Sequence, residues 1–117
     1  MKLLTVYKIL PVIVIYKKID KPFVGKAHAM VVFIDPNHIG DEGLLEHELV
    51  HVKQFYRFPF HGLLYKLNNW YRLKCEVEAY RKQLEFNPAN SDIFAGYISE
   101  RYGLKISRKE VLLLLEE

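Results

Sequence analysis

The chain has 117 residues, with 17 Lys and Arg against 14 Asp and Glu, five His and one Cys. This length suits one domain with one modest core, and a hydrophobic content of 50% is typical of a packed globule rather than a disordered chain. The formal charge of +3 is mild and the lysines are scattered, which argues against a nucleic-acid-binding protein. A single cysteine excludes an internal disulfide and a cysteine-based zinc finger.

The N-terminal segment only partly resembles a signal peptide. Met1-Lys2-Leu3-Leu4 opens like one, but Lys8 and Pro11 interrupt the apolar stretch, and the charged residues at 17–21 follow it. No window supplies the roughly 20 continuous apolar residues that a transmembrane helix needs. We therefore expect a soluble cytoplasmic protein without a membrane span.

The first third of the chain has the composition of β-strands. Residues 3–16 are rich in β-branched and aromatic side chains and contain Pro11, which predicts two strands or one bent strand. Residues 17–27 are polar and predict a loop. Residues 28–34 predict a further strand, which stops at the turn signal Asp35-Pro36-Asn37.

After this turn the hydrophobic residues recur at helical spacing. Because strands come first and helices follow, we expect an α+β fold, with a small, mostly antiparallel sheet of about three strands packed on two long helices. All of this fits one domain over residues 1–117. The predicted helices are 41–57, capped by Asp41; 63–86, ending before Asn87-Pro88; 91–103, ending at Gly103; and 108–116, with Ser107 and Glu110 as a capping box.

The residues His47-Glu48-Leu49-Val50-His51 form an HExxH motif inside the first predicted helix. Residues four apart share one helix face, so both imidazoles can reach one Zn²⁺. Glu48 lies about 100° from His47 around the helix and stands beside the ion. We therefore predict His47 and His51 as zinc ligands and Glu48 as the base that takes a proton from a zinc-bound water. The alternative is an ordinary helix in which two His fall four residues apart.

A catalytic zinc site needs a third protein ligand, which must lie downstream. The extended motif HExxHxxGxxH is excluded because the chain has Gln54 and Arg57 at the positions of its Gly and third His. His61 is within reach, but it falls in a turn, where a solvated His is the simpler interpretation.

Two glutamates in the second long helix are the remaining candidates, and the helical wheel separates them. Glu76 lies about 60° from Leu73, on the flank of the apolar stripe, whereas Glu78 lies about 140° from it, near the solvent face. A ligand must face the neighbouring helix, so we predict Glu76 as the third ligand. Its alternative role is an ion pair with Arg72 one turn earlier.

This combination of motifs resembles the gluzincin metallopeptidases. Residues 76–80, EVEAY, are similar to the E-x-x-A-D pattern of membrane peptidases of the CAAX prenyl protease and β-lactam sensor kinds, whose first Glu is a metal ligand and maps onto Glu76. Tyr80 departs from the pattern, because it stands where an Asp usually orients a ligand His. Over residues 28–85 the chain resembles the minigluzincins, small soluble counterparts of those domains.

The resemblance also implies how substrate is bound. In gluzincins an edge strand above the active-site helix binds an extended peptide by strand addition. Here that strand would be residues 28–34, with Ala29, Val31 and Phe33 as substrate-binding residues; the alternative is an ordinary sheet strand. The family stabilises the oxyanion with a His, Tyr or Arg near the zinc. The candidates for this role are Tyr71, Arg72, Tyr80 and His28.

The C-terminal segment is apolar around a whole helix turn. Residues 111–115 read VLLLL, which is typical of a helix that completes the core. The alternative is a segment that covers the substrate groove and keeps the enzyme latent, or that docks on a second copy to form a homodimer.

Together these features predict a zinc metalloendopeptidase that acts on a peptide or protein substrate. Two rival interpretations remain. One is a non-catalytic interaction module with a structural zinc, and the other is a metal-free helical adaptor. The fourth coordination position separates an enzyme from a structural site, because an enzyme keeps it open.

Overall fold

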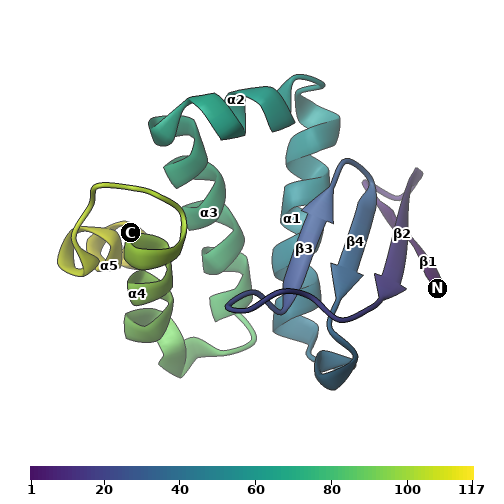
Figure 1. Ribbon diagram of the computed structural model, residues 1–117, viewed down its shortest axis with the longest axis horizontal. Coiled ribbons are helices and arrows are strands. Elements are labelled where there is room, and N and C mark those ends of the chain that lie inside the picture. Colours follow the sequence, from purple (N-terminus) through teal and green to yellow (C-terminus); the bar gives the residue numbers. More distant parts are fainter.

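The N-terminal part of the chain forms a four-stranded mixed sheet in the computed structural model, which describes residues 1–117 (Figure 1). The strand order is β1-β2-β4-β3, so β1 and β3 are the edges. Two pairings, β1 with β2 and β3 with β4, are antiparallel, and β2 with β4 is parallel. The strands are β1 (Lys2–Val6), β2 (Leu10–Tyr16), β3 (Gly25–His28) and β4 (Val31–Ile34).

The two strands predicted within residues 3–16 are confirmed as the hairpin of β1 and β2. The strand predicted over residues 28–34 is wrong, because the chain turns at Ala29 and Met30 and only β4 lies beyond that turn. The loop predicted over residues 17–27 is wrong at its end, because β3 begins at Gly25. Ala29 adopts a left-handed backbone (φ 52°) without the Gly, Asn or Asp that usually marks such a turn. The edge strand is therefore β3, and β4 is internal to the sheet.

Five helices follow, which together with the sheet confirms the α+β class. The predicted helix 41–57 is confirmed as α1, and the Asp41 side chain caps it by accepting a hydrogen bond from the Leu44 amide at 3.0 Å. The helices are α1 (Glu42–Arg57), α2 (His61–Leu67), α3 (Asn69–Leu84), α4 (Ser91–Arg101) and α5 (Arg108–Glu116).

The single helix predicted over residues 63–86 is wrong, because α2 and α3 are separate helices that meet at Asn68. Asn68 has an extended backbone (φ −122°, ψ 112°), and its side chain accepts a hydrogen bond from the Tyr71 amide at 2.9 Å. One residue thus ends α2 and caps α3.

The predicted ends of the last two helices agree with the structure. Gly103 follows α4 with φ +67°, a backbone conformation that glycine adopts without strain. The Ser107 hydroxyl accepts a hydrogen bond from the Glu110 amide at 3.1 Å and so caps α5. No helix of the structure is long and apolar enough to cross a membrane.

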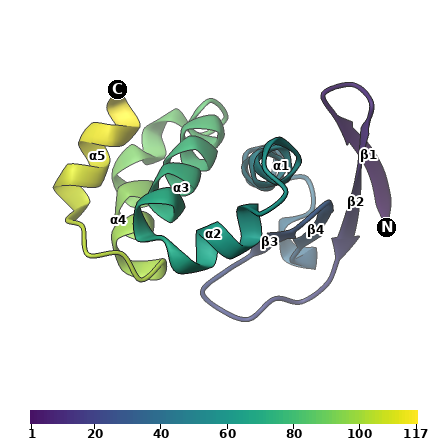
Figure 2. The same cartoon turned by 90° about the horizontal axis from the view of Figure 1, so that it is seen from above.

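The elements stack as successive layers, with the sheet at one end, then α1, α3, α4 and α5, and with α2 bridging from α1 to α3 (Figures 1 and 2). The core divides accordingly into two clusters. The sheet cluster contains Val6, Val12, Val14, Val32, Ile34, Leu44, Leu49 and Val52. The helical cluster contains Leu73, Tyr80, Phe94, Ala95, Ile98, Val111 and Leu115.

Candidate metal centre

Helix α1 carries the HExxH motif on the face that it turns toward α3. His47 and Glu48 are buried and His51 is nearly so, because this face of α1 is enclosed between the sheet and the helical half. The His47 ring packs edge-on against the Tyr80 ring of α3, with 4.3 Å between the ring centroids. Local helix geometry and packing thus fix both imidazoles on one side of α1.

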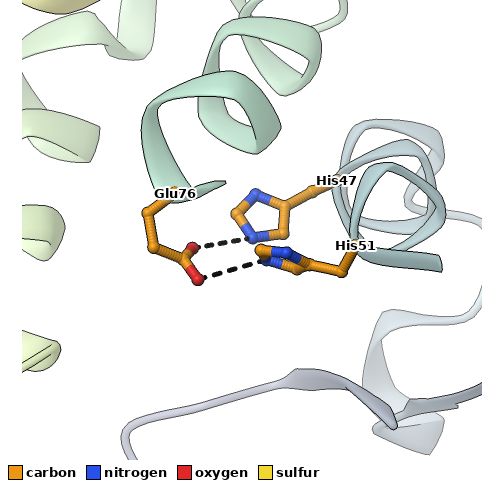
Figure 3. A group of neighbouring side chains, drawn as sticks. All are labelled: His47, His51 and Glu76. Carbon is orange, nitrogen blue, oxygen red and sulfur yellow. Dashed lines mark ion pairs between the residues drawn. The ribbon is translucent and has the colours of Figure 1, made fainter. Parts of the chain in front are cut away.

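Glu76 projects from α3 toward the two histidines, so the three predicted ligands converge (Figure 3). Its Oε1 lies 3.5 Å from Nε2 of His47, and its Oε2 lies 3.2 Å from Nε2 of His51. Ligand atoms at about 2.0–2.1 Å from a tetrahedral zinc are about 3.3 Å from one another. The three residues are therefore spaced to hold one metal ion.

The hydrogen bonding of this group is incomplete in a way that fits a metal ligand set. Oε1 of Glu76 is buried and has no hydrogen-bond partner, although Glu76 is only 1% exposed. A buried carboxylate is costly unless charges, hydrogen bonds or a metal compensate it. Its predicted alternative, an ion pair with Arg72, does not form, because the Arg72 guanidinium donates instead to the carbonyls of Tyr65 and Lys66.

His51 is oriented by a hydrogen-bond network that the sequence did not indicate. Its Nδ1 lies 2.8 Å from Oε1 of Gln54, and Nε2 of the buried Gln54 donates to the Cys75 carbonyl at 3.0 Å and to Glu78 at 2.9 Å. Glu78 also forms an ion pair with Arg57 at 2.8 Å. Gln54 thus holds the ring nitrogen of His51 that points away from the ligand set.

His47 has no such partner. Tyr80, which stands at the Asp position of the E-x-x-A-D pattern, packs its ring on His47, and its hydroxyl lies 2.8 Å from the hydroxyl of Tyr102. Nδ1 of His47 is consequently buried without a hydrogen bond. Aromatic packing, rather than a carboxylate, positions this histidine.

The charges of the group depend on one another. Burial alone would raise the pKa of Glu76, but the neighbouring His51 and His47 lower it well below its usual range. Burial alone would lower the pKa of His51, but the Glu76 carboxylate raises it to about 9. His51 is therefore protonated at neutral pH when no metal is bound, and a metal must displace that proton. Burial raises the pKa of Glu48.

A cleft with a volume of about 890 Å³ opens onto the ligand set. His47, Glu48, His51 and Glu76 all line it, together with residues of β3, α2 and the end of α4. Tyr65 of α2 also lines it, and its hydroxyl donates a hydrogen bond to Oε2 of Glu76. No local pattern indicates Tyr65, because its contact with Glu76 depends on the break between α2 and α3.

Only some of the predicted substrate-binding and oxyanion residues line this cleft. Of the three predicted substrate-binding residues, Phe33 lines it and Ala29 and Val31 do not. The edge strand β3 contributes Gly25, Lys26 and Ala27 instead. Among the four oxyanion candidates only Arg72 lines the cleft. His61 also lines it, with its Nδ1 2.7 Å from the Tyr71 hydroxyl.

Helix α5 lies away from this cleft. Val111 and Leu115 are buried in the helical cluster, and no residue beyond Tyr102 lines the cleft. This placement agrees with a helix that completes the core, and no contact supports a groove-covering role for it.

Comparison of the chain with models of known protein families, with curated proteins and with solved structures finds no match in any of the three.

Proposed function

We propose that this protein is a zinc-dependent metalloendopeptidase of the gluzincin type, built like the minigluzincins that its motifs resemble. The observation that carries the proposal is the convergence of His47, His51 and Glu76 beside Glu48 at the wall of an open cleft. A ligand set and a general base placed together where a substrate can enter support catalysis rather than a purely structural ion.

The donor atoms favour zinc. Two imidazole nitrogens and one carboxylate are a ligand set that catalytic zinc uses, with a further position left for water or substrate. When bound, zinc would polarise the scissile carbonyl and lower the pKa of a water molecule. The incomplete hydrogen bonding of Glu76 Oε1 and its depressed pKa suit a carboxylate that serves as a metal ligand.

The residues around this ion have separate tasks. Glu48 accepts the proton of the attacking water and returns it to the leaving amine. The edge strand β3 offers unpaired main-chain groups to an extended peptide, which aligns the peptide along the cleft. Arg72 and Tyr65 line the same cleft and are the groups available to stabilise negative charge on the substrate carbonyl.

The first experiment measures zinc in the untagged protein by elemental analysis. We expect about one zinc per chain, lost in Glu76→Ala and kept in the matched variant Glu78→Ala, because only the first removes a ligand. A chain that contains no zinc and takes none up on reconstitution would contradict the proposal.

The second experiment measures cleavage of an unstructured protein by the zinc-loaded chain. Glu48→Gln should retain zinc and stability but reduce cleavage by about 10²–10⁴-fold, since it removes a proton acceptor and no ligand. Equal cleavage by this variant would eliminate the mechanism. Bound zinc without any cleavage in the parent chain would favour the non-catalytic interaction module instead.

A further inference from the structure

Most of the charged side chains that line the cleft beside the ligand set are positive. Apart from the site carboxylates Glu48 and Glu76, Asp20 is the only acidic residue that lines it, whereas six basic residues do. The whole chain carries 17 basic and 14 acidic residues, so this imbalance is a property of the cleft and not of the composition. The six are Lys17, Lys18, Lys26, Lys66, Arg72 and Arg101.

None of these six cations is neutralised within the chain. The ion pairs between side chains involve His38, His47, His51, Arg57, Lys82 and Arg108, and none of the six. The four lysines are exposed at the cleft, with the Lys17 ammonium 4.5 Å from the centre of the Phe33 ring. A cleft lined by unpaired charges of one sign attracts ligands of the opposite sign.

The two arginines are held in place by neutral groups, which leaves their charge available. Arg72 donates to the Tyr65 carbonyl at 2.7 Å, and its Nε is buried without any hydrogen-bond partner. The Arg101 guanidinium lies 3.7 Å from the centre of the Tyr97 ring. Neither guanidinium has an anionic partner, so both positive charges contribute to the potential of the cleft.

The cations come from several sides of the cleft. Lys17 and Lys18 follow β2, and Lys26 lies on the edge strand β3. Lys66 belongs to α2, Arg72 to α3 and Arg101 to the end of α4. A peptide that extends β3 would therefore lie among positive charges from several elements.

We propose that the ligand of this cleft is an acidic peptide, with Asp or Glu side chains close to the bond at the metal site. As a statement about the substrate, this rests on the proposed function. The two charges of a zinc ion would offset those of Glu48 and Glu76, which leaves the six cations to set the electrostatic preference. The edge strand favours a peptide over other anionic polymers, because its free main-chain groups can pair with an extended peptide backbone.

The test measures binding, so that it does not depend on catalysis. Three fluorescent peptides of one core sequence carry Glu, Gln or Lys at every variable position, and fluorescence anisotropy measures their affinity for the intact chain with and without zinc. We expect the Glu peptide to bind at least about tenfold more tightly than the Gln peptide and the Lys peptide to bind most weakly, with differences that shrink at high salt.

Charge reversal locates the effect. Lys26→Glu combined with Lys66→Glu should abolish or invert the order of the three peptides, because it changes both sides of the cleft. The matched control, Lys2→Glu with Lys109→Glu, makes the same change in net charge at exposed residues outside the cleft and should leave the order intact. Equal affinities for the three peptides, or equal effects of the two double variants, would overturn the proposal.

Two further outcomes are distinguishable. If a single-stranded oligonucleotide of the same charge displaces the Glu peptide at lower concentration than the unlabelled peptide itself does, the cations select phosphate and the proposal is wrong. If the Glu peptide is preferred but the zinc-loaded chain cleaves none of the three, the acidic ligand is supported and the peptidase function fails instead.

Discussion

The sheet half of the molecule, β1–β4 with α1, and the helical half, α3–α5, are built from different residues. The sheet cluster contains only aliphatic side chains, most of them valine, as expected of residues that pack on a pleated surface. The helical cluster includes the aromatic residues Tyr80 and Phe94. The chain's four buried polar residues belong to neither cluster and lie on the facing helices α1 and α3: His47, Glu48, Gln54 and Glu76.

This contrast shows that the two halves meet through a polar seam, which we define as these four residues. Each half has an apolar core of its own, but the seam contains groups that are costly to bury. In the metal-free chain it is stabilised by the ion pair of Glu76 with the two histidines, which compensates only part of that cost. A metal ion at this place would join the two halves with the same ligands that the proposed chemistry needs.

The largest expected effect therefore concerns stability. Zinc that binds only the folded chain should raise the free energy of unfolding by about 4 kcal/mol when free zinc is about a thousandfold above its dissociation constant. Thermal unfolding followed by circular dichroism, with and without zinc, measures this as a rise of the midpoint on the order of 10 °C. A chelator should reverse it.

The matched variants of this measurement are Glu76→Ala and Glu78→Ala. The rise in the unfolding midpoint on adding zinc should disappear in the first variant and persist in the second, because Glu78 contacts Gln54 and Arg57 and none of the three ligands. If zinc still raises the unfolding midpoint of Glu76→Ala, zinc binds elsewhere and the seam does not join the two halves through a metal.

Three of the four seam residues, His47, Glu48 and Glu76, were singled out from the sequence because their signals are local, whereas Gln54 was not. The HExxH spacing places His47 and His51 on one face of any helix, and Asp41 is a standard cap residue. The wheel also separated Glu76 from Glu78, since burial follows the apolar stripe of a single helix: Glu76 is buried and Glu78 is exposed. Helix spacing and the helical wheel use one helix alone and need no knowledge of the element that packs against it.

The remaining features depend on tertiary structure and carried no local signal. The turn at Ala29 and Met30 lacks the residues that usually mark a hairpin, so most of β3 was assigned to the predicted loop 17–27. Gln54 contacts His51 within one helix, but its hydrogen bond to the Cys75 carbonyl joins residues 21 positions apart in the sequence. The six cations of the cleft come from five separate segments, and only the fold brings them together.

A smaller effect is expected where the two helices of the seam are hydrogen-bonded. Gln54→Met keeps the volume of the side chain but removes the bonds to His51, Cys75 and Glu78. Loss of such a supporting contact typically reduces metal affinity about 10–100-fold. Competition with a chromophoric chelator measures this. Gln83→Met is the control, because the Gln83 side chain on α3 makes no hydrogen bond, and it should leave zinc affinity unchanged.

The smallest expected effect is at the edge of the sheet half, where Gly25 of β3 lies close to Glu48, the proposed general base. A Cβ added at Gly25 would lie 2.8 Å from Oε2 of Glu48 and 2.9 Å from Cδ1 of Leu44. Both atoms end flexible side chains, so Gly25→Ala should fold and bind zinc normally but displace the Glu48 carboxylate. We expect a fall of about tenfold in cleavage, since small misplacements of a catalytic group are costly.

Gly62→Ala is the matched control for this change, because Gly62 lines the same cleft and has no atom within 4 Å of an added Cβ. It should leave cleavage unchanged, which separates crowding of Glu48 from a general effect of an added methyl group. Similar losses of cleavage in both variants would mean that an added methyl group only obstructs the peptide in the cleft. A loss confined to Gly25→Ala would show that the edge strand positions the proposed base as well as the substrate, and hence that β3 contributes to the chemistry alongside α1.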